Sequence, residues 1–278
     1  MDNRPPIQPG DNDLRSSARE SGEGDGPPIQ LGKLHYSING EAILDGLDLS
    51  VRRGEIVAIM GRSGTGKTTV LRLIMGLIRP TSGSIRINGA EITSLGEQDL
   101  GAVRADMGMV FQGAALCDSM TVGENVAFGL LEHRRLPATE VAGRMQQLLE
   151  MVDMAGTEDL LPAQLSGGMR KRVGIARALA LEPSIMLYDE PTAGLDPISA
   201  AATDALISRL RDRVGVTSLI VSHDVQSLRR ISDRAAVLHK GRFLAVAPMA
   251  ELERTSDAAI SQFLSGSPDG PLSDKAGQ

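Results

Sequence analysis

A glycine-rich segment, GRSGTGKT at residues 61–68, constrains this chain more than any other feature. It follows the short apolar stretch Glu55–Met60, which is typical of a strand, and precedes apolar residues at helical spacing from Val70 onward. A glycine-rich turn between a strand and a helix lets backbone N–H groups point at phosphate oxygens, and the helix N-terminus adds favourable partial charge. The segment therefore predicts a phosphate-binding loop.

The segment matches the P-loop pattern G-x-x-x-x-G-K-[ST] at every fixed position. We expect Lys67 to reach the β- and γ-phosphates of a nucleotide and Thr68 to offer its hydroxyl to Mg²⁺. The predicted nucleotide-binding residues here are Gly61, Arg62, Ser63, Gly64, Thr65, Gly66, Lys67, Thr68 and Thr69. A glycine-rich turn that binds nothing is the alternative, and the strand and helix patterns on either side argue against it.

Two acidic residues end a second apolar stretch, IMLYDE at residues 185–190. An acid at the end of a buried strand is the expected second holder of Mg²⁺ beside a phosphate loop, and Asp189 has that position. Glu190 follows it and could polarise an attacking water. Taken alone, Glu190 would be an ordinary surface carboxylate at a strand-to-loop junction. Beside Asp189 and the phosphate loop, it is the predicted catalytic residue.

Strand patterns near the start of the chain and alternating patterns near its end indicate the fold class. Apolar alternation predicts strands at Gln30–Tyr36 and Ile43–Val51. One face of the second strand is expected to carry Ile43, Leu47, Leu49 and Val51. Later in the chain, strands and helices alternate at Ser184–Asp189, Ile198–Val214, Val216–Val221, from about Asp224, and at Arg234–His239. Such alternation implies parallel strands joined by helical crossovers.

The middle of the chain has a mostly helical pattern, with helices expected at Met120–Leu131, Thr139–Asp153 and Ser166–Leu181. We therefore predict an α/β fold: a P-loop NTPase core of mixed or parallel sheet with flanking helices, an N-terminal antiparallel β region and a helical insertion subdomain. The predicted domain covers 29–265, with the helical subdomain at about 97–182. Composition predicts a disordered leader at 1–28 and a polar tail, disordered by default, at 266–278.

Composition also excludes several classes of protein. The 278 residues carry a net charge of −6, which disfavours non-specific nucleic-acid binding. Aromatic residues make up only 2%, so stacking platforms for single strands are not expected. No apolar run approaches the roughly 20 residues needed to span a bilayer, so any membrane role is expected through a partner. The single cysteine, Cys117, cannot form an internal disulfide.

A second glycine-rich segment, LSGGM at residues 165–169, opens another predicted helix. Ser166 can cap that helix, while Gly167 and Gly168 let backbone N–H groups approach an anion. With this segment, the chain resembles the ATP-binding cassette (ABC) ATPases. The segments that carry the resemblance, in that family's order, are GRSGTGKT at 61–68, VFQ at 110–112, LSGGM at 165–169, IMLYDEP at 185–191, AGLD at 193–196 and SHD at 222–224.

The resemblance implies a role for the second glycine-rich segment. In that family this segment binds the γ-phosphate of an ATP molecule held by the opposite subunit. The resemblance implies the same role for Ser166, Gly167 and Gly168. Met169 departs from the Gln that the family commonly has, but the Ser-Gly-Gly part that faces phosphate is intact. An ordinary helix start with a serine cap is the structural alternative.

Four further roles are implied by the resemblance. Gln112 resembles the Q-loop glutamine, which reaches Mg²⁺ or the attacking water, and His223 resembles the switch histidine that contacts the γ-phosphate. Asp196 resembles the D-loop aspartate that faces across the dimer, and it can also serve as a helix N-cap. Tyr36 is the aromatic residue that could stack on adenine, and a core or edge-strand tyrosine is an equal alternative.

Within that family, the chain is similar to the ATPase of Mce-type phospholipid transporters, the Mla lipid-asymmetry system of Gram-negative bacteria. The similarity is carried by FQGAALCDSMTVGENVAF at 111–128, LEH at 131–133, LP at 136–137, DPI at 196–198, and QFL at 262–264 with PDGP at 268–271. Cys117 stands where Mla ATPases usually have Phe, and TAG at 192–194 departs from some of them.

This similarity implies the ligands, partners and location of the chain. ATP and Mg²⁺ are the expected ligands. The expected partners are a second copy of the chain, a transmembrane permease, and Mce-domain and often STAS-domain subunits, with no nucleic acid. The implied location is the cytoplasmic face of the inner membrane, reached through the permease. A tail comparable to 266–278 packs on the neighbouring subunit in Mla ATPases.

The implied function is ATP hydrolysis by a subunit that dimerises around two ATP and powers a permease, for phospholipid transport that maintains outer-membrane lipid asymmetry. The ATPase of another importer or exporter, of small-solute or solvent-tolerance type, stays open, as does a non-transport ATPase of the same family. A regulatory module without catalysis would be expected to lack Glu190 or His223. The basic run at 170–172 is interpreted as a solvated helix face, with a nucleic-acid patch as the weaker alternative.

Overall fold

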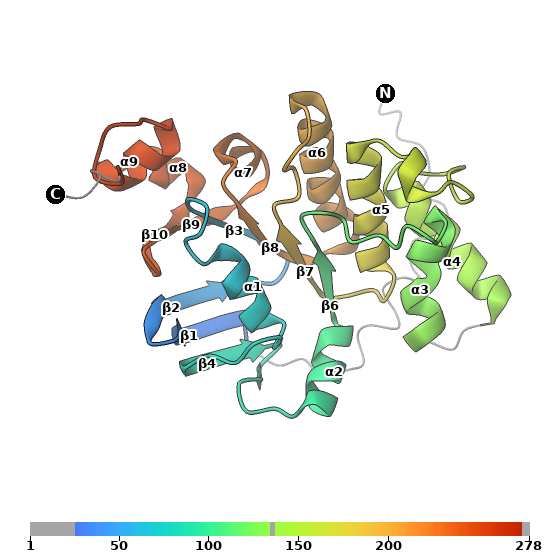
Figure 1. Cartoon of the computed structure of the whole chain (residues 1–278), viewed down its shortest axis with the longest axis horizontal. Coiled ribbons are helices and arrows are strands. Elements are labelled where there is room, and N and C mark those ends of the chain that lie inside the picture. The colour runs from blue at the N-terminus through green and yellow to red at the C-terminus, as the bar shows by residue number, and fades with distance from the viewer. Residues whose placement is uncertain (1–25, 134–136, 274–278) are drawn as a thin grey trace, which may run out of the picture.

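The computed structural model describes residues 26–133 and 137–273. Most of the predicted leader, residue 136 of the quoted segments and the last five residues of the predicted tail therefore lie outside the described residues. The described chain contains two sheets, with helices between and around them (Figure 1). Its first strand starts at Ile29, where the sequence predicts that order begins.

The smaller sheet is the predicted antiparallel β region. Its strand order is β2-β1-β4-β5, with β1 at Ile29–Ile38, β2 at Glu41–Val51, β4 at Ser82–Ile87 and β5 at Ala90–Glu91. Its apolar face joins a core with helix α1, Lys67–Ile74, and with one face of the larger sheet. Residues from three distant parts of the sequence thus share one buried cluster.

The predicted apolar face of β2 is wrong at one position. Leu44 is fully buried together with Leu47, while Ile43 is only partly buried. Between these two positions β2 has one residue more than β1, since Leu34 pairs with Leu47 and Tyr36 with Leu44. Gly46, which has a φ of +72°, lies inside this bulge. A bulge reverses the alternation of side chains, so strict period-two spacing selected the wrong residue.

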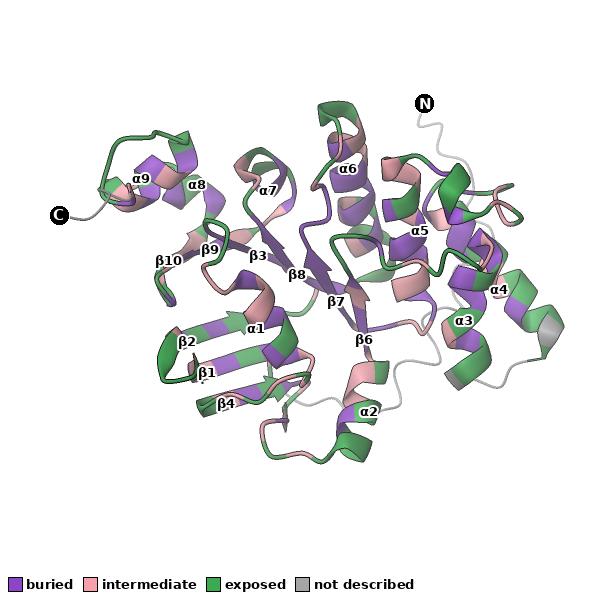
Figure 2. Cartoon of the chain, in the orientation of Figure 1, coloured by how far each residue is buried: buried purple, intermediate pink, exposed green. Residues whose placement is uncertain are grey.

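The larger sheet has the order β10-β9-β3-β8-β7-β6. Its strands are β3 at Ile56–Met60, β6 at Met107–Val110, β7 at Ile185–Asp189, β8 at Thr217–Ser222, β9 at Arg234–His239 and β10 at Arg242–Pro248. All pairs are parallel except β9 with β10. Strands β3, β7 and β8 are buried along their whole length (Figure 2). Because these three strands are parallel, their carboxyl ends lie at the same edge of the sheet.

The three helices predicted for the middle of the chain are confirmed as α3, α4 and α5, with bounds Val122–His133, Ala138–Met151 and Gly167–Leu179. They pack together to one side of the larger sheet (Figure 1). The range 97–182 also contains helix α2, Glu97–Ala105, and strand β6, which belongs to the larger sheet. The mutually packed helices α3, α4 and α5 therefore begin only after β6.

The remaining helices cover the larger sheet and end the described chain. They are α6 at Pro197–Val214, α7 at Val225–Ile231, α8 at Met249–Leu252 and α9 at Ala258–Ser265, with a short 3₁₀ turn at Pro162–Gln164. Helices α6 and α7 match the predicted crossovers, whereas α8 and α9 were not predicted. In the described ranges, no helix has both the length and the apolar character to cross a membrane.

The predicted disorder of the tail is wrong for its described part. Leu272 is buried, with an exposed fraction of 8%. Its backbone N–H donates to Gln262 Oε1 at 2.6 Å, and Gln262 Nε2 donates to the Ser267 carbonyl at 3.1 Å. The buried Gln262 side chain thus bonds backbone groups of the segment that follows α9 and holds that segment against the helix.

Candidate nucleotide-binding and catalytic site

The predicted phosphate loop connects β3 to α1 and is built around two glycine positions. A Cβ atom on Gly61 would lie 2.5 Å from the Leu238 carbonyl oxygen, so only glycine fits beside β9. Gly66 begins α1 as its N-cap with a φ of +100°, in the region that favours glycine. The loop therefore presents bare backbone at the N-terminus of a helix, the arrangement that attracts anions.

Lys67 is held across this loop. Its Nζ donates to the carbonyl oxygens of Gly61 at 2.8 Å and Arg62 at 3.1 Å, and lies 3.7 Å from Glu190 Oε1. The side chain is buried, and burial lowers the pKa of Lys67, while the carboxylates of Glu190 and Asp189 oppose that shift. A cation near two carboxylates at a helix N-terminus is placed for contact with phosphate.

Thr68 and Asp189 form the pair predicted to hold Mg²⁺. Thr68 Oγ1 donates to Asp189 Oδ1 at 3.1 Å, although the two residues come from α1 and the end of β7. Burial raises the pKa of Asp189, and the hydrogen bond from Thr68 opposes that rise. Magnesium in phosphate-transfer sites is usually held by one or two carboxylates together with phosphate and water oxygens. This hydroxyl–carboxylate pair fits that chemistry.

The Glu190 carboxylate is bonded at both of its oxygens. Ser222 Oγ donates to Oε2 at 2.8 Å, and the His223 backbone N–H donates to the same oxygen at 3.3 Å. His223 Nδ1 lies 2.9 Å from Oε1. Glu190 also has a φ of +49°, a conformation that costs energy for a residue with a side chain. Strand β8 lies beside β7, and this pairing brings Ser222 and His223 to Glu190.

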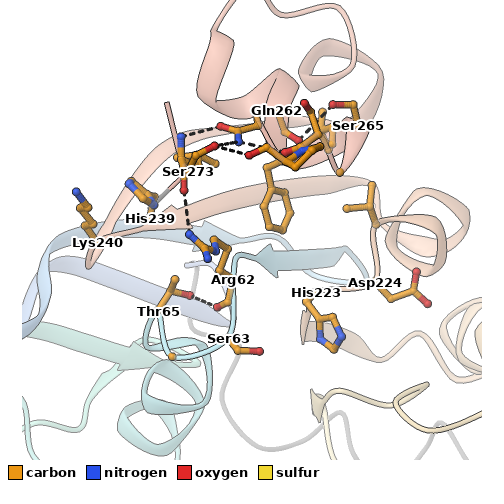
Figure 3. A pocket seen from close by; sticks show the side chains of 18 of the residues that line it. Arg62, Ser63, Thr65, His223, Asp224, His239, Lys240, Gln262, Ser265 and Ser273 are labelled. Atoms are coloured by element: carbon orange, nitrogen blue, oxygen red, sulfur yellow. Dashed lines mark hydrogen bonds between the residues drawn. The ribbon is translucent and has the colours of Figure 1, made fainter. Parts of the chain in front are cut away.

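A cleft of about 1340 Å³ opens in front of the phosphate loop. Its walls come from Arg62–Thr65 of the loop, His223–Gln226, Glu41–Ile43, His239–Gly241, and the segment from α9 to the tail. In Figure 3, Arg62 points from the loop toward the tail and His223 lies across the cleft. Arg62 Nη1 donates to the Leu272 carbonyl at 2.9 Å. The cleft is therefore bounded on one side by the C-terminal segment.

The structure brings together only part of the predicted site. Lys67, Thr68, Asp189, Glu190 and His223 are brought together by the contacts described above, and His223 also lines the cleft. Ser166, Gly167 and Gly168 take part in none of these contacts and do not line the cleft. Ser166 does cap α5, because its Oγ accepts a hydrogen bond from the Met169 N–H at 3.2 Å.

Three other predicted residues also lie apart from the cleft. Asp196 caps α6 by accepting from the N–H groups of Ile198 and Ser199, both at 3.0 Å, and hydrogen bonds from Ser199 lower the pKa of Asp196. The Gln112 residue is exposed. Tyr36 is half-buried opposite Leu44 and packs on the core of the smaller sheet, while Glu41–Ile43 line the cleft instead. Adenine stacking by Tyr36 therefore stays a prediction.

Sequence reasoning missed several residues around the site. Ser222 was not predicted as a site residue, although it belongs to the SHD segment. Its hydroxyl at the end of an apolar strand could have indicated a contact with the site. The C-terminal segment gave no signal, because a polar stretch without a phosphate or metal motif does not indicate a cleft wall.

The interpretation of the basic run at 170–172 is wrong for its central residue. Lys171 is buried, with an exposed fraction of 5%, and its Nζ donates to the carbonyls of Gln112 and Glu190. Arg170 is exposed, and Arg172 reaches Asp153 at 3.3 Å. Consecutive residues on a helix point about 100° apart, so a run of three cations cannot lie on one face.

Comparisons with known proteins show the family of the chain. A protein-family model described as "ABC transporter" matches residues 44–193. The chain is 40% identical over 244 residues to the intermembrane phospholipid transport system ATP-binding protein MlaF of Haemophilus influenzae, covering 88% of this chain and 92% of that protein. It is also 40% identical over 238 residues to the methionine import ATP-binding protein MetN of Brucella abortus, covering 86% and 64%.

A solved structure gives the same fold. The dimeric ATP-binding cassette MJ0796 bound to ADP and Pi is 33% identical, with a TM-score of 0.72 over 80% of this chain and 98% of that chain. The predicted P-loop core, antiparallel β region and helical subdomain are thereby confirmed as the fold class.

Proposed function

The chain belongs to the ABC transporter family as an ATP-hydrolysing cassette, and from this premise we propose that two copies clamp two ATP molecules and drive a membrane permease that carries phospholipid. The observation that carries the catalytic part is the meeting of Lys67, Thr68, Asp189, Glu190 and His223 at one edge of the sheet. Each of these groups has a separate task in phosphoryl transfer.

In the proposed reaction, the loop N–H groups and Lys67 bind the β- and γ-phosphates. Thr68 and Asp189 would hold Mg²⁺, which supplies charge neutralisation at the phosphates. Glu190 orients the attacking water through its carboxylate and accepts a hydrogen bond from it. His223, already bonded to Glu190 through Nδ1, has its other ring nitrogen for the γ-phosphate. The exposed Gln112 side chain joins this set when the Q-loop approaches the nucleotide.

The proposal of two copies rests on the position of the second glycine-rich segment. Ser166, Gly167 and Gly168 form a capped helix N-terminus that does not line the cleft of their own chain. The similar cassette MJ0796 was solved as a dimer with ADP and Pi. We therefore assign these three residues and Asp196 to the ATP held by the second copy.

The proposal of phospholipid as the substrate rests on similarity along the whole chain. The MlaF protein of Haemophilus influenzae is matched over 92% of its length, and MetN of Brucella abortus over 64% of its length. A permease with Mce-domain and STAS-domain subunits, at the cytoplasmic face of an inner membrane, is the corresponding assembly. A methionine or other small-solute importer is the second candidate, because its ATPase is equally identical over the matched region.

The test is to purify the tagged chain from native membranes with its bound subunits and to reconstitute the complex in phospholipid vesicles. We expect a multi-spanning permease to co-purify, and ATP-dependent movement of a fluorescent phospholipid between vesicles and an acceptor. Methionine added to the same complex is the matched control. Stimulation by methionine without phospholipid movement, or recovery of soluble partners alone, would contradict the proposal.

A further inference from the structure

Three residues of α5 contact the loop that follows β6. Lys171, Gly174 and Arg177, which we call the α5 contact row, recur every third residue and so share one face of the helix. Lys171 Nζ donates to the Gln112 carbonyl at 2.5 Å. A Cβ on Gly174 would lie 3.2 Å from both the Cβ and the carbonyl oxygen of Ala114. The loop therefore lies directly on the helix.

Arg177 completes the row one turn further along. Its Nη1 donates to the Ala115 carbonyl, and its guanidinium carbon lies 5.8 Å from the centroid of the Phe128 ring. Ala114 and Ala115 have φ values of +63° and +51°, which only surrounding contacts can maintain in residues other than glycine. The α5 contact row thus supports the backbone of the segment that carries Gln112.

Lys171 makes a second contact that the other two residues do not. Its Nζ also donates to the Glu190 carbonyl at 3.1 Å. The backbone of Glu190 has a φ of +49°, and its N–H donates to the Val221 carbonyl at 2.9 Å. Glu190 is therefore held at its N–H by β8 and at its carbonyl by α5.

The position of Lys171 is costly unless its hydrogen bonds are made. An ammonium taken out of water must be compensated by hydrogen bonds and nearby negative charge. Lys171 is 5% exposed, and burial lowers its pKa, opposed by the carboxylates of Glu190 and Asp189. Lys171 therefore joins the Gln112 and Glu190 carbonyls through one buried ammonium.

We propose that Lys171 is a positioning residue that couples α5, the helix opened by the second glycine-rich segment, to the Q-loop and the catalytic glutamate of its own chain. The coupling between two ATP sites rests on the proposed function, in which the N-terminus of α5 serves the ATP of the second copy. Lys171 follows Gly167 by four residues, about one helical turn. A shift of α5 on phosphate binding at Ser166–Gly168 therefore moves the ammonium that holds Gln112 and Glu190.

The test compares Lys171→Met, Lys171→Arg and Arg172→Met in the full-length protein within its transporter complex. Methionine keeps the length of the side chain and removes the donors, so Gln112 and Glu190 lose a charged hydrogen-bond partner. We expect the Kd for ATP to stay within about threefold and kcat to fall about tenfold or more. The Hill coefficient for ATP should fall toward one. Lys171→Arg, which keeps a buried multi-donor cation, should recover much of the rate.

The matched control is Arg172→Met, which removes a cation from the same helix that faces Asp153 instead. Its kcat should stay within about twofold of the parent, because exposed pairs contribute little. A readout without nucleotide is hydrogen–deuterium exchange, where Lys171→Met should speed exchange in residues 111–117 and leave the core of the smaller sheet unchanged.

Three results would overturn the proposal: a Lys171→Met protein with parental kcat and Hill coefficient, unchanged exchange at 111–117, or equal losses in all three variants. A parent protein that hydrolyses ATP without cooperativity would contradict the two-copy proposal instead. In that case, kcat and hydrogen exchange still decide whether Lys171 positions Glu190.

Discussion

At the scale of single residues, the two oxygens of the Glu190 carboxylate have different hydrogen-bond partners. Ser222 and the His223 backbone hold Oε2, while His223 Nδ1 and Lys67 Nζ approach Oε1 at 2.9 and 3.7 Å. These contacts come from β8 and α1, so the carboxylate is oriented before any water approaches it. Such preorganisation is what a catalytic carboxylate needs.

Glu190→Gln should therefore preserve the geometry of the site and remove the carboxylate that activates the attacking water. The amide keeps an oxygen that can accept from Ser222, but it cannot draw a proton from water. We expect ATP binding close to the parent and hydrolysis lower by about 10²- to 10⁴-fold. Phosphate release and equilibrium ATP binding on the same preparation measure both quantities. Near-normal turnover would remove Glu190 from its assigned role.

Sequence patterns predicted the site residues that belong to one continuous motif. They did not predict residues that only the fold brings close to that motif. Lys67, Thr68, Asp189 and Glu190 lie at strand ends and helix starts that can be found by pattern. The contact between Ser222 and Glu190 spans 32 residues and depends on which strands pair. Lys171 was misassigned because composition reports charge, whereas the face of a helix decides burial.

At the scale of elements, the chain was most predictable where a strand is buried along its length or a helix has a regular apolar face. Strands β3, β7, β8 and β9 and helices α5 and α6 were predicted close to their bounds. Strands β4, β5, β6 and β10 were not predicted. β5 has two residues, β6 and β10 are the two edges of the larger sheet, and β4 has only two large apolar residues, Ile85 and Ile87. The bulge in β2 escaped because a single extra residue leaves no periodic signal.

The contact between α6 and α7 contains an acid outside the catalytic site. Asp204 on α6 has an exposed fraction of 1% and accepts from Ser227 Oγ of α7 at 2.5 Å. Arg230 Nε lies 3.4 Å from its other oxygen. Burial raises the pKa of Asp204, opposed by the hydrogen bond from Ser227 and the charge of Arg230. The folded protein thus binds a proton here more tightly than the unfolded chain.

This predicts how pH acts on the packing of α6 against α7. Between about pH 4 and the raised pKa, the folded state holds more protons at Asp204, so its contribution to stability falls as pH rises. In Asp204→Asn this dependence is absent. Urea unfolding of both proteins from pH 4 to 7 should show the parent losing stability relative to the variant as pH rises. A constant difference across that range would refute the assignment.

At the scale of the whole molecule, the C-terminal segment closes one side of the cleft. Leu272 packs into the protein and its carbonyl accepts from Arg62 of the phosphate loop. This hydrogen bond joins residues 62 and 272, which are 210 positions apart in the sequence. A segment that sequence analysis separated from the domain therefore lines the cleft in front of the phosphate loop.

Removal of residues 266–278 should therefore weaken the fold. The chain loses the burial of Leu272 and its hydrogen bonds to Gln262 and Arg62. We expect a loss of about 2–4 kcal/mol in the free energy of unfolding. Denaturant unfolding measures it, with removal of 274–278 alone as the matched control. Sedimentation of the same two proteins tests whether the tail also packs on a neighbouring copy. Unchanged stability, dimerisation and ATPase rate would show that the segment is dispensable.

The proposed assignment of the two glycine-rich segments to different copies makes the assembly testable without a structure of the dimer. Lys67→Ala removes the cation of the phosphate loop, and Gly168→Asp places a negative charge where phosphate is expected. A Cβ on Gly168 meets Ser199 Cβ only at 3.6 Å, an ordinary contact, so the second variant should fold. Each variant alone should be inactive in both ATP sites of a symmetric pair.

A mixture of the two variants should regain activity. Every heterodimer contains one site in which an intact phosphate loop faces an intact signature segment from the other copy. With random pairing, half of the dimers are mixed and one of their two sites works, which gives roughly a quarter of the parental rate. Differently tagged copies, purified in tandem, confirm that heterodimers are present. Coupling between the two ATP sites lowers this fraction, because the second site of each heterodimer is broken. Purified heterodimers with no more ATP turnover than either variant alone would contradict the assignment of Ser166–Gly168 to the second copy.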